Sequence, residues 1–412
     1  MATIKPFECV RPQVDLANKV AALPYDVYNR AEAKEAALKE PLSFLNIDRP
    51  ETQFEDSMDM YDPCVYQKAK ELYNARKTDQ TYLTDTKAGY YIYELIMNQR
   101  SQTGIVACAS IDDYCNNIIM KHENTREEKE QDRIRHVDTM SAQTGPIFLA
   151  YRSNVIISNL VNTIKQQPSL YSFTSADQIT HHVWKIADSK QIATIYNEFA
   201  NIDQIYIADG HHRAASAVKV GLQRRNSSVY FTGEEEFNFF LSVLFPEDQL
   251  MIMPYNRVVK DLNGYTKDEF LKKVAECFLI NKTGAVKVNP EKKGTFGMYL
   301  DGEWYHLHAK DAITKTTDPV DSLDVSVLQN YLLNPVLAIK DPRIDHRIDF
   351  IGGIRGLDEL ERRANNDMTV AFSMYPTSIQ ELFKVADAKK LMPPKSTWFE
   401  PKLRSGLFIH EI

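Results

Sequence analysis

An apolar strand, a sharp turn and a helix follow one another at residues 204–220, and this order constrains the fold more than any other feature. Residues 204–208 are apolar and short enough to form a buried strand, while the alanine-rich residues 214–220 favour a helix. Between them stands the turn pair Asp209-Gly210. Because α/β folds are built from strands that lead directly into helices, we expect a mixed α/β (α+β) protein.

Further elements are expected on both sides of this unit. Strand formers predict a hairpin from residues 89–95 and 104–111, and strands at 147–151, 237–244 and 250–254. Helices are predicted at 51–79 and 124–142, the second opened by a Thr125-x-x-Glu128 capping box and stopped at Gly145. From about residue 261 a lysine-rich helix precedes a strand pair, which predicts another α+β module. We therefore divide the chain into a catalytic region at 1–258 and a module at 259–412.

The composition excludes several classes of protein. The 49 basic and 56 acidic residues are interspersed, so the net charge is −7 and no segment offers the basic stripe that duplex nucleic acid requires. The five cysteines are scattered and lack zinc or redox spacing. Neither a signal-peptide segment nor an apolar run of about 18 residues is seen. We expect a cytoplasmic protein with no nucleic-acid partner and no membrane partner.

The turn Asp209-Gly210-His211-His212-Arg213 is the strongest candidate for chemistry. Backbone N–H groups and the positive dipole at the start of a helix favour a bound phosphate, and Gly210 lets the backbone approach it closely. Arg213 can grip phosphate with two hydrogen bonds, while Asp209 can hold Mg²⁺ or accept a proton from an attacking hydroxyl. The alternative is an ordinary capped helix with two surface histidines.

A second candidate is the charged segment at residues 121–133. His122, Arg126, Lys129 and Arg133 are spaced so that a helix starting early enough would carry them on one face as a cationic stripe. The alternative is a solvated helix laced with Glu–Lys pairs. A zinc-protease motif is excluded, because His122-Glu123 is not followed by the second histidine.

Two loops are weaker candidates, and several common motifs are absent. Tyr25 and Asp26 follow Pro24 in a loop, and Arg257 ends the polar segment 253–257. The sequence contains no P-loop, no kinase glycine-rich loop, no G-x-G-x-x-G and no G-x-S-x-G. The common nucleotide-binding and hydrolase folds are therefore excluded.

Taken together, these segments resemble one family. Residues 24–27, 121–133, 145–148 and 208–213 occur in the order found in a large bacterial and protist family long labelled only as a domain of unknown function. The turn at 209–213 is also similar to that of archaeal free serine kinases, which share the ParB and sulfiredoxin-like fold and phosphorylate L-serine with ADP. The resemblance implies a ParB/sulfiredoxin-like core with a strand-turn-helix phosphate loop.

The resemblance also implies a function. It is the phosphorylation of free L-serine to O-phospho-L-serine for cysteine and serine metabolism, with Mg²⁺ as cofactor. The donor is pyrophosphate or a nucleotide, ADP or ATP. Pyrophosphate offers no base to stack on, so the protein has to bind it through many cationic groups, and the number of such groups in these segments favours it. A phosphoserine phosphatase is the nearest alternative, and a ParB-like nucleotide- or DNA-binding protein is an alternative of another class.

The residues follow from this assignment. The proton acceptor is expected to be Asp209, Glu123 or Asp26, which the sequence does not rank, and Asp209 is also the expected Mg²⁺ ligand. The groups expected to bind phosphate or substrate are Gly210, His211, His212, Arg213, His122, Thr125, Arg126, Lys129, Arg133, Tyr25 and Arg257.

Overall fold

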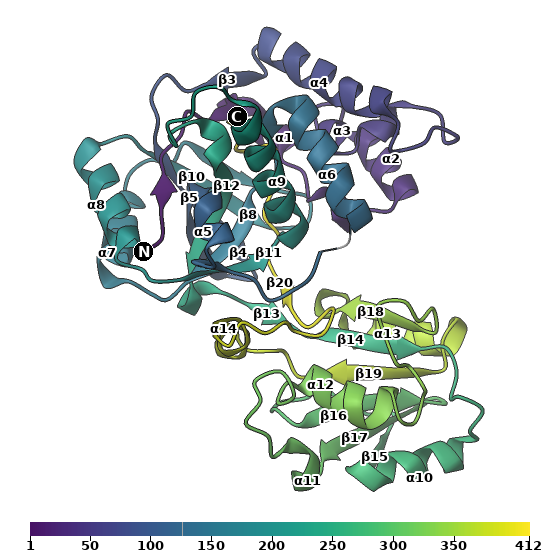
Figure 1. The fold of residues 1–412 in the computed structure, drawn as a ribbon. Helices are drawn as coiled ribbons and strands as arrows, with labels where there is room; N and C mark the ends of the chain where they lie inside the picture. Colours follow the sequence, from purple (N-terminus) through teal and green to yellow (C-terminus); the bar gives the residue numbers. More distant parts are fainter. Residues whose placement is uncertain (126) are drawn as a thin grey trace. The chain divides into compact units, whose positions relative to one another are not determined.

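A computed structural model describes residues 1–125 and 127–412, and the chain in it forms two compact units (Figure 1). The first unit comprises residues 1–250 and 401–412, and the second comprises residues 251–400. The boundary at 258/259 stays a prediction. Residues 401–412 nevertheless belong to the first unit, where strand β21 (His410–Glu411) pairs with β7 (Ala142–Gln143).

A nine-stranded mixed sheet is the centre of the first unit. Both parallel and antiparallel neighbours occur, since β12 runs parallel to β8 and antiparallel to β5. In spatial order the strands are β6 (Ile119–Met120), β11 (Ile205–Asp209), β8 (Ile147–Tyr151), β12 (Phe239–Pro246), β5 (Arg100–Ser110), β4 (Tyr90–Met97), β10 (Thr180–Ile186) and β9 (Tyr171–Thr174), with β1 (Ile4–Lys5) pairing β5. The predicted strands at 147–151, 204–208 and 237–244 are confirmed.

Helices surround this sheet, and the mixed α/β class is confirmed. One hydrophobic cluster joins the strands to four helices: Ile111 comes from α5, Ile157 from α7, Phe199 from α8 and Ala214 from α9. The helices of the first unit are α1 (Ala17–Val20), α2 (Arg30–Lys39), α3 (Leu45–Asp48), α4 (Pro63–Thr78), α5 (Ile111–Cys115), α6 (Glu127–Met140), α7 (Val155–Ile164), α8 (Ser189–Ala200) and α9 (His211–Ser227). A short ladder of β2 (Val10–Pro12) and β3 (Tyr82–Thr84) completes the unit.

The predicted helix at 51–79 is wrong in its first part. Residues 50–53 form a 3-10 turn, and α4 begins at Pro63. Asp62 caps this helix, because its carboxylate accepts the Cys64 N–H at 2.9 Å, and a proline in the first helical position needs no N–H partner. The Asp62-Pro63 pair is thus the true start signal.

The predicted hairpin is confirmed, but its loop is much shorter than expected. β4 and β5 continue through residues 96–103 and turn at Asn98 and Gln99, whose φ angles are 50° and 66°. Two consecutive left-handed residues form the tight turn that matches the twist of a two-stranded ribbon. Asparagine tolerates this conformation. The polar residues between the two predicted strands therefore form the ends of those strands and not a long loop.

The second unit is built on a six-stranded antiparallel sheet. Its strands in spatial order are β15 (Phe278–Gly284), β17 (Glu303–Ala309), β16 (Thr295–Leu300), β19 (Val370–Met374), β14 (Tyr255–Val259) and β18 (Ile348–Gly352). A separate pair is formed by β13 (Ile252–Met253) and β20 (Trp398–Phe399). The helices are α10 (Lys267–Cys277), α11 (Asp311–Thr314), α12 (Asp324–Leu328), α13 (Gly356–Asn366) and α14 (Ile379–Asp387). The predicted lysine-rich helix and the strand pair that follows it are confirmed as α10 and the β16–β17 pair.

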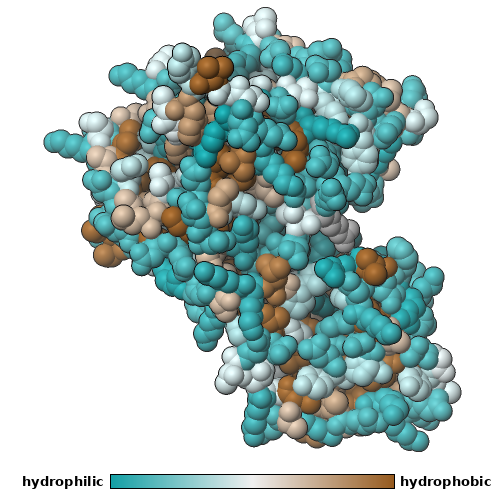
Figure 2. Space-filling model, viewed as in Figure 1, coloured by the Kyte–Doolittle hydropathy of each residue, from teal (hydrophilic) through white to brown (hydrophobic). Residues whose placement is uncertain are grey.

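The surface agrees with the mixed charge of the sequence. In Figure 2 the exposed side chains are mainly hydrophilic, and hydrophobic ones lie in small separate groups. Within residues 1–125 and 127–412, no helix is both long enough and apolar enough to cross a membrane.

Candidate active site

β11, Gly210 and α9 form the strand-turn-helix unit that the sequence predicts. Gly210 occupies the N-cap position with φ 93°, a left-handed conformation that side chains rarely adopt. A Cβ at this position would also lie only 3.1 Å from the Arg213 guanidinium. In the part of the chain that the structure describes, no side chain caps α9. A helix start without a side-chain cap is what the predicted anion site requires, and the binding of an anion there stays a prediction.

Asp209 ends β11, and three neighbours hold its carboxylate. Oδ1 accepts a hydrogen bond from the Gly210 N–H at 2.9 Å, while Oδ2 lies 3.1 Å from Nζ of Lys402 and 3.9 Å from Nη2 of Arg213. Burial alone would raise the pKa of Asp209, but Lys402 and Arg213 hold it well below its usual range. The carboxylate is therefore ionised at neutral pH.

Arg213 is anchored on the segment that follows β7. Its Nη1 donates to the Pro146 carbonyl at 2.6 Å, and the guanidinium passes beside Gly145. A Cβ at Gly145 would lie 3.2 Å from the Ser405 hydroxyl and 3.6 Å from the Arg213 side chain. The Gly145-Pro146 pair, predicted only to stop a helix, thus also positions the arginine. A guanidinium has five N–H donors, so this anchor leaves donors for a ligand.

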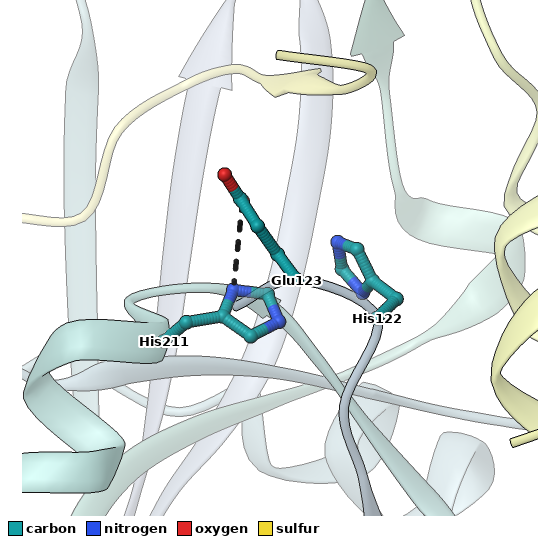
Figure 3. A group of neighbouring side chains, drawn as sticks. All are labelled: His122, Glu123 and His211. Carbon is teal, nitrogen blue, oxygen red and sulfur yellow. Dashed lines mark ion pairs between the residues drawn. The ribbon is translucent and has the colours of Figure 1, made fainter. Parts of the chain in front are cut away.

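Two histidines and a glutamate lie beside the turn (Figure 3). His122 and Glu123 come from the loop between β6 and α6, and His211 is the first residue of α9. The two imidazole rings meet edge to face with centroids 4.4 Å apart, and Glu123 Oε2 lies 4.0 Å from Nδ1 of His211. Burial lowers the pKa of His122 to about 4 and also lowers that of His211. Both rings are therefore neutral at physiological pH.

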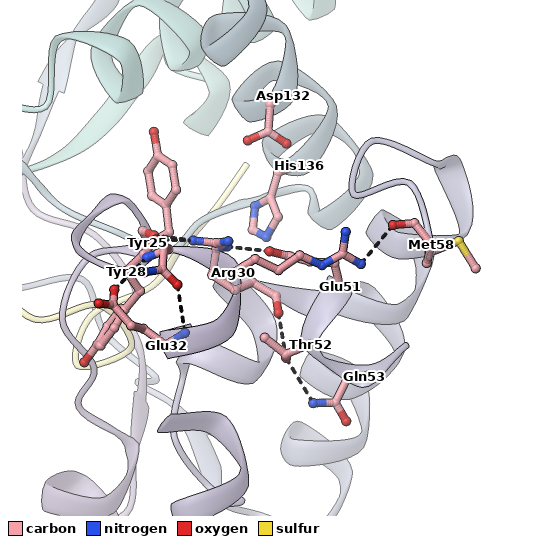
Figure 4. A network of polar contacts seen from close by, with 12 residues as sticks. Tyr25, Tyr28, Arg30, Glu32, Glu51, Thr52, Gln53, Met58, Asp132 and His136 are labelled. Carbon is pink, nitrogen blue, oxygen red and sulfur yellow. Dashed lines mark hydrogen bonds and ion pairs between the residues drawn. The ribbon is translucent and has the colours of Figure 1, made fainter. Parts of the chain in front are cut away.

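A polar network supports the loop that contains Tyr25 (Figure 4). The buried Arg49 donates to the carbonyls of Tyr25 at 2.9 Å and Tyr28 at 2.8 Å, and its Nε donates to Glu51 at 2.5 Å. Arg133 lies over the ring of Tyr25, with its guanidinium carbon 4.1 Å from the ring centroid. Arg49 thus fixes the loop backbone, and Arg133 fixes the ring.

Two small cavities meet at Tyr25 and Arg133. One, of about 30 Å³, is also lined by Arg213. The other, of about 130 Å³, is lined by Lys129 and by the exposed Asp26. The structure therefore brings the predicted residues Tyr25, Arg133 and Arg213 together around one cavity and places Lys129 and Asp26 at the next.

The predicted cationic stripe is not one helix face. α6 begins at Glu127, whereas His122 lies in the preceding loop against His211. Arg133 is buried and pairs with Asp132, whose Oδ2 lies 2.9 Å from Nε of the arginine, while Lys129 is exposed. The prediction of a continuous stripe is therefore wrong, because the buried His122 ring packs on the turn instead of on the helix. The Arg126 prediction lies outside the described residues.

The capping box predicted for this helix is also wrong. The Thr125 hydroxyl donates to Glu130 at 2.7 Å, and Glu130 forms an ion pair with Lys219 on α9. Glu128 accepts a hydrogen bond from Tyr61. Thr125 therefore connects the start of α6 to α9 and is not an N-cap of the predicted kind.

The remaining predicted residues lie in different places. His212 is half-buried in the first turn of α9. Arg257 belongs to the second unit, where it is buried over Phe350 and donates to the carbonyls of Tyr255 and Lys395. Its guanidinium thus contributes to the structure of the second unit, and its role toward a ligand stays a prediction.

Sequence reasoning missed three residues of this site. Lys402 lies near the C-terminus, outside the candidate segments predicted from the sequence, yet it pairs with Asp209. Arg49 holds the Tyr25 loop and Asp132 pairs with Arg133, and the sequence predicts neither contact. Such contacts can be predicted only when the fold is known, because the partners are far apart in the sequence. Lys402 and Asp209, for example, are 193 positions apart.

The fold and the turn define a mixed α/β protein with the strand-turn-helix unit that the sequence predicts. A family described as a protein of unknown function (DUF1015) matches residues 4–326, and the chain therefore belongs to this family. Comparison with curated proteins found no match.

Several solved structures are distantly similar. A free serine kinase in complex with AMP has 13% identity and a TM-score of 0.35, covering 72% of this chain and 86% of that one. SbnI with C-terminal truncation from Staphylococcus aureus has 10% identity and a TM-score of 0.38, with coverages of 72% and 82%. A conserved hypothetical protein from Pyrococcus furiosus has 13% identity and a TM-score of 0.33, with coverages of 73% and 93%.

Proposed function

We propose that the first unit transfers a phosphoryl group to the hydroxyl of free L-serine. The observation that carries this proposal is the ionised Asp209 carboxylate, which lies between Lys402 and Arg213 next to the uncapped first turn of α9. A donor phosphate needs N–H groups and cations, and an acceptor hydroxyl needs a carboxylate to orient it. The turn offers both kinds of group within a few residues.

The chemistry follows from these roles. The serine hydroxyl oxygen forms a bond to the terminal phosphorus of the donor, and the bond from that phosphorus to the bridging oxygen breaks. The electron pair of the broken bond stays on the leaving phosphate, and the hydroxyl proton passes to Asp209. A carboxylate with a lowered pKa suffices, because in a loose transition state the proton leaves late, when the oxygen already carries the phosphoryl group.

Pyrophosphate remains our preferred donor over ADP and ATP. The sequence contains no P-loop, no kinase glycine-rich loop and no G-x-G-x-x-G, the common motifs that bind nucleotide phosphates. Arg213, Lys402 and the first-turn N–H groups are suited to the charge of a compact polyphosphate. These observations favour a donor without a base.

An amino-acid acceptor is supported by the larger cavity. Its lining contains two matched pairs of opposite charge, Arg49 with Glu51 and Arg133 with Asp132. Free serine carries an ammonium and a carboxylate, so a small cavity with both signs of charge complements it. We therefore place the acceptor near Tyr25.

The expected Mg²⁺ fits Asp209 poorly. One carboxylate oxygen faces the ammonium of Lys402, and the other accepts the Gly210 N–H, whereas Mg²⁺ prefers oxygen ligands arranged around it without a competing cation. Mg²⁺ would supply charge neutralisation when it is bound to the donor phosphates. The positioning of donor and acceptor is assigned to the protein side chains.

A donor screen tests the proposal. Purified protein is incubated with L-serine, Mg²⁺ and pyrophosphate, ADP or ATP, and the products are followed by ³¹P NMR and mass spectrometry. We expect O-phospho-L-serine in the pyrophosphate reaction. Release of phosphate from O-phospho-L-serine without any donor-dependent synthesis would favour a phosphatase, and no turnover with any donor would refute the proposal.

A further inference from the structure

The His122, Glu123 and His211 cluster has properties that phosphate binding does not explain. One ligand atom from each residue lies within 4.8 Å of the other two. His122 is 2% exposed and His211 is 7% exposed, and Nδ1 of His122 and Nε2 of His211 have no hydrogen-bond partner in the described parts of the chain. A buried ring nitrogen without a partner costs free energy unless a ligand satisfies it.

We infer that His122, Glu123 and His211 bind one divalent transition-metal ion of the Zn²⁺ type. Two imidazoles and one carboxylate are a frequent ligand set for such ions and leave a coordination position open for water or a substrate oxygen. This inference does not depend on the proposed phosphoryl transfer.

The geometry is close to what such an ion needs. Bonds of about 2.0–2.2 Å around a tetrahedral ion place the ligand atoms about 3.4 Å apart. The present spread of up to 4.8 Å therefore has to contract by about 1.4 Å. Glu123 can supply this movement, because its side chain is 40% exposed and stands on a loop, whereas the rings are fixed by burial.

The charges around the cluster also bear on a cation. Glu123 brings a carboxylate to the two rings, with its Oε2 4.0 Å from Nδ1 of His211. The nearby Lys121 opposes a cation, but its Nζ lies over the ring of Tyr114 at 4.1 Å. Asp209 is already paired with Lys402 and Arg213, so Glu123 is the carboxylate that would supply negative charge to the ion.

The ligand set also separates Zn²⁺ from Mg²⁺. Imidazole nitrogen is a good ligand for zinc, whereas Mg²⁺ prefers oxygen ligands and retains several waters. A site with two nitrogens and one carboxylate should therefore select the transition metal. Because His211 opens α9, the bound ion would lie beside the first-turn N–H groups and add positive charge to the anion site.

Calorimetry without any phosphate donor tests the inference. Full-length protein stripped with EDTA is titrated with ZnCl₂ and with MgCl₂, and we expect one Zn²⁺ per chain, bound at least about tenfold more tightly than Mg²⁺. Glu123→Gln and His211→Gln should each weaken Zn²⁺ binding by about tenfold or more. The controls Glu127→Gln and His182→Gln replace an exposed glutamate and a half-buried histidine outside the cluster and should bind like the wild type.

A spectroscopic measurement covers the case in which a ligand variant does not fold. Zinc K-edge absorption of the wild-type complex should show nitrogen and oxygen ligands with two imidazoles and no sulfur. Zn²⁺ binding no tighter than Mg²⁺, equal binding by folded ligand variants, or a spectrum dominated by sulfur or water would each overturn the inference. Since no donor is present, these results are independent of the serine kinase assay.

Discussion

The exchange of Asp209 for asparagine tests the central role assigned to the turn. Asparagine has nearly the same shape and its oxygen can still accept the Gly210 N–H, so the backbone of the turn should persist. The substitution removes the charge that faces Lys402 and Arg213 and the oxygen that would take the hydroxyl proton. We expect turnover to fall by about 100-fold or more, the usual size of a general-base contribution.

The stability cost can be worked out from the ion pair. Two unit charges 3.1 Å apart attract by about 5 kcal/mol at an effective dielectric constant of 20. Desolvation offsets most of this, although the Lys402 side chain is only 15% exposed and loses a close partner. We therefore expect Asp209→Asn to lower the free energy of unfolding by about 2 kcal/mol, which leaves a folded protein.

The assay combines turnover with unfolding. Pyrophosphate-dependent synthesis of O-phospho-L-serine is measured for the wild type, Asp209→Asn, Lys402→Met and the double variant, and urea unfolding is measured for the same four proteins. Asp203→Asn is the matched control, because Asp203 is exposed and precedes β11. Near-normal turnover by a folded Asp209→Asn protein would refute the catalytic role, and additive stability losses in the double variant would refute the pairing with Lys402.

Three further predictions concern other parts of the structure. Arg213→Lys should raise the KM for pyrophosphate about tenfold in steady-state kinetics, since a lysine cannot both hold the Pro146 carbonyl and grip phosphate; an unchanged KM would count against phosphate contact. Arg49→Met should lower the urea-derived free energy of unfolding by about 3 kcal/mol, because the carbonyls of Tyr25 and Tyr28 and the Glu51 carboxylate lose their buried partner; a loss below about 1 kcal/mol would contradict this. In the second unit, burial raises the pKa of Asp324 to about 7, so the folded state keeps a proton that the unfolded chain releases near pH 4. The free energy of unfolding should therefore fall as the pH rises from about 4 to 7, by up to about 1.4 kcal/mol per pH unit. Asp324→Asn should flatten that slope in thermal unfolding from pH 4.5 to 7.5, and an unchanged slope would show that another group titrates.

Local signals predicted the parts of the site that are continuous in sequence. The strand at 204–208, the Asp209-Gly210 turn and the following helix are encoded within about 20 residues by apolar pattern, turn chemistry and alanine content. The structure places them as expected, and α9 already begins at His211.

The predictions that failed depend on contacts between distant segments. Spacing alone suggested a helix face containing His122, but burial against His211 keeps this residue in a loop. Thr125 satisfies the pattern of a capping box, yet its hydroxyl finds Glu130 instead of a backbone N–H. Local patterns cannot weigh such tertiary partners, and Lys402 was missed for the same reason.

The return of residues 401–412 to the first unit sets the order in which the protein can be completed during synthesis. The ribosome delivers residues 251–400 before the segment that supplies Lys402 and the β21 partner of β7. Until then Asp209 lacks Lys402, its nearest cation, and only Arg213 faces its charge, so the turn should bind phosphate more weakly. A nascent chain stalled at residue 400 is expected to be inert toward pyrophosphate and to exchange the β7 amides rapidly. Activity would thus report that translation has run through the whole second unit.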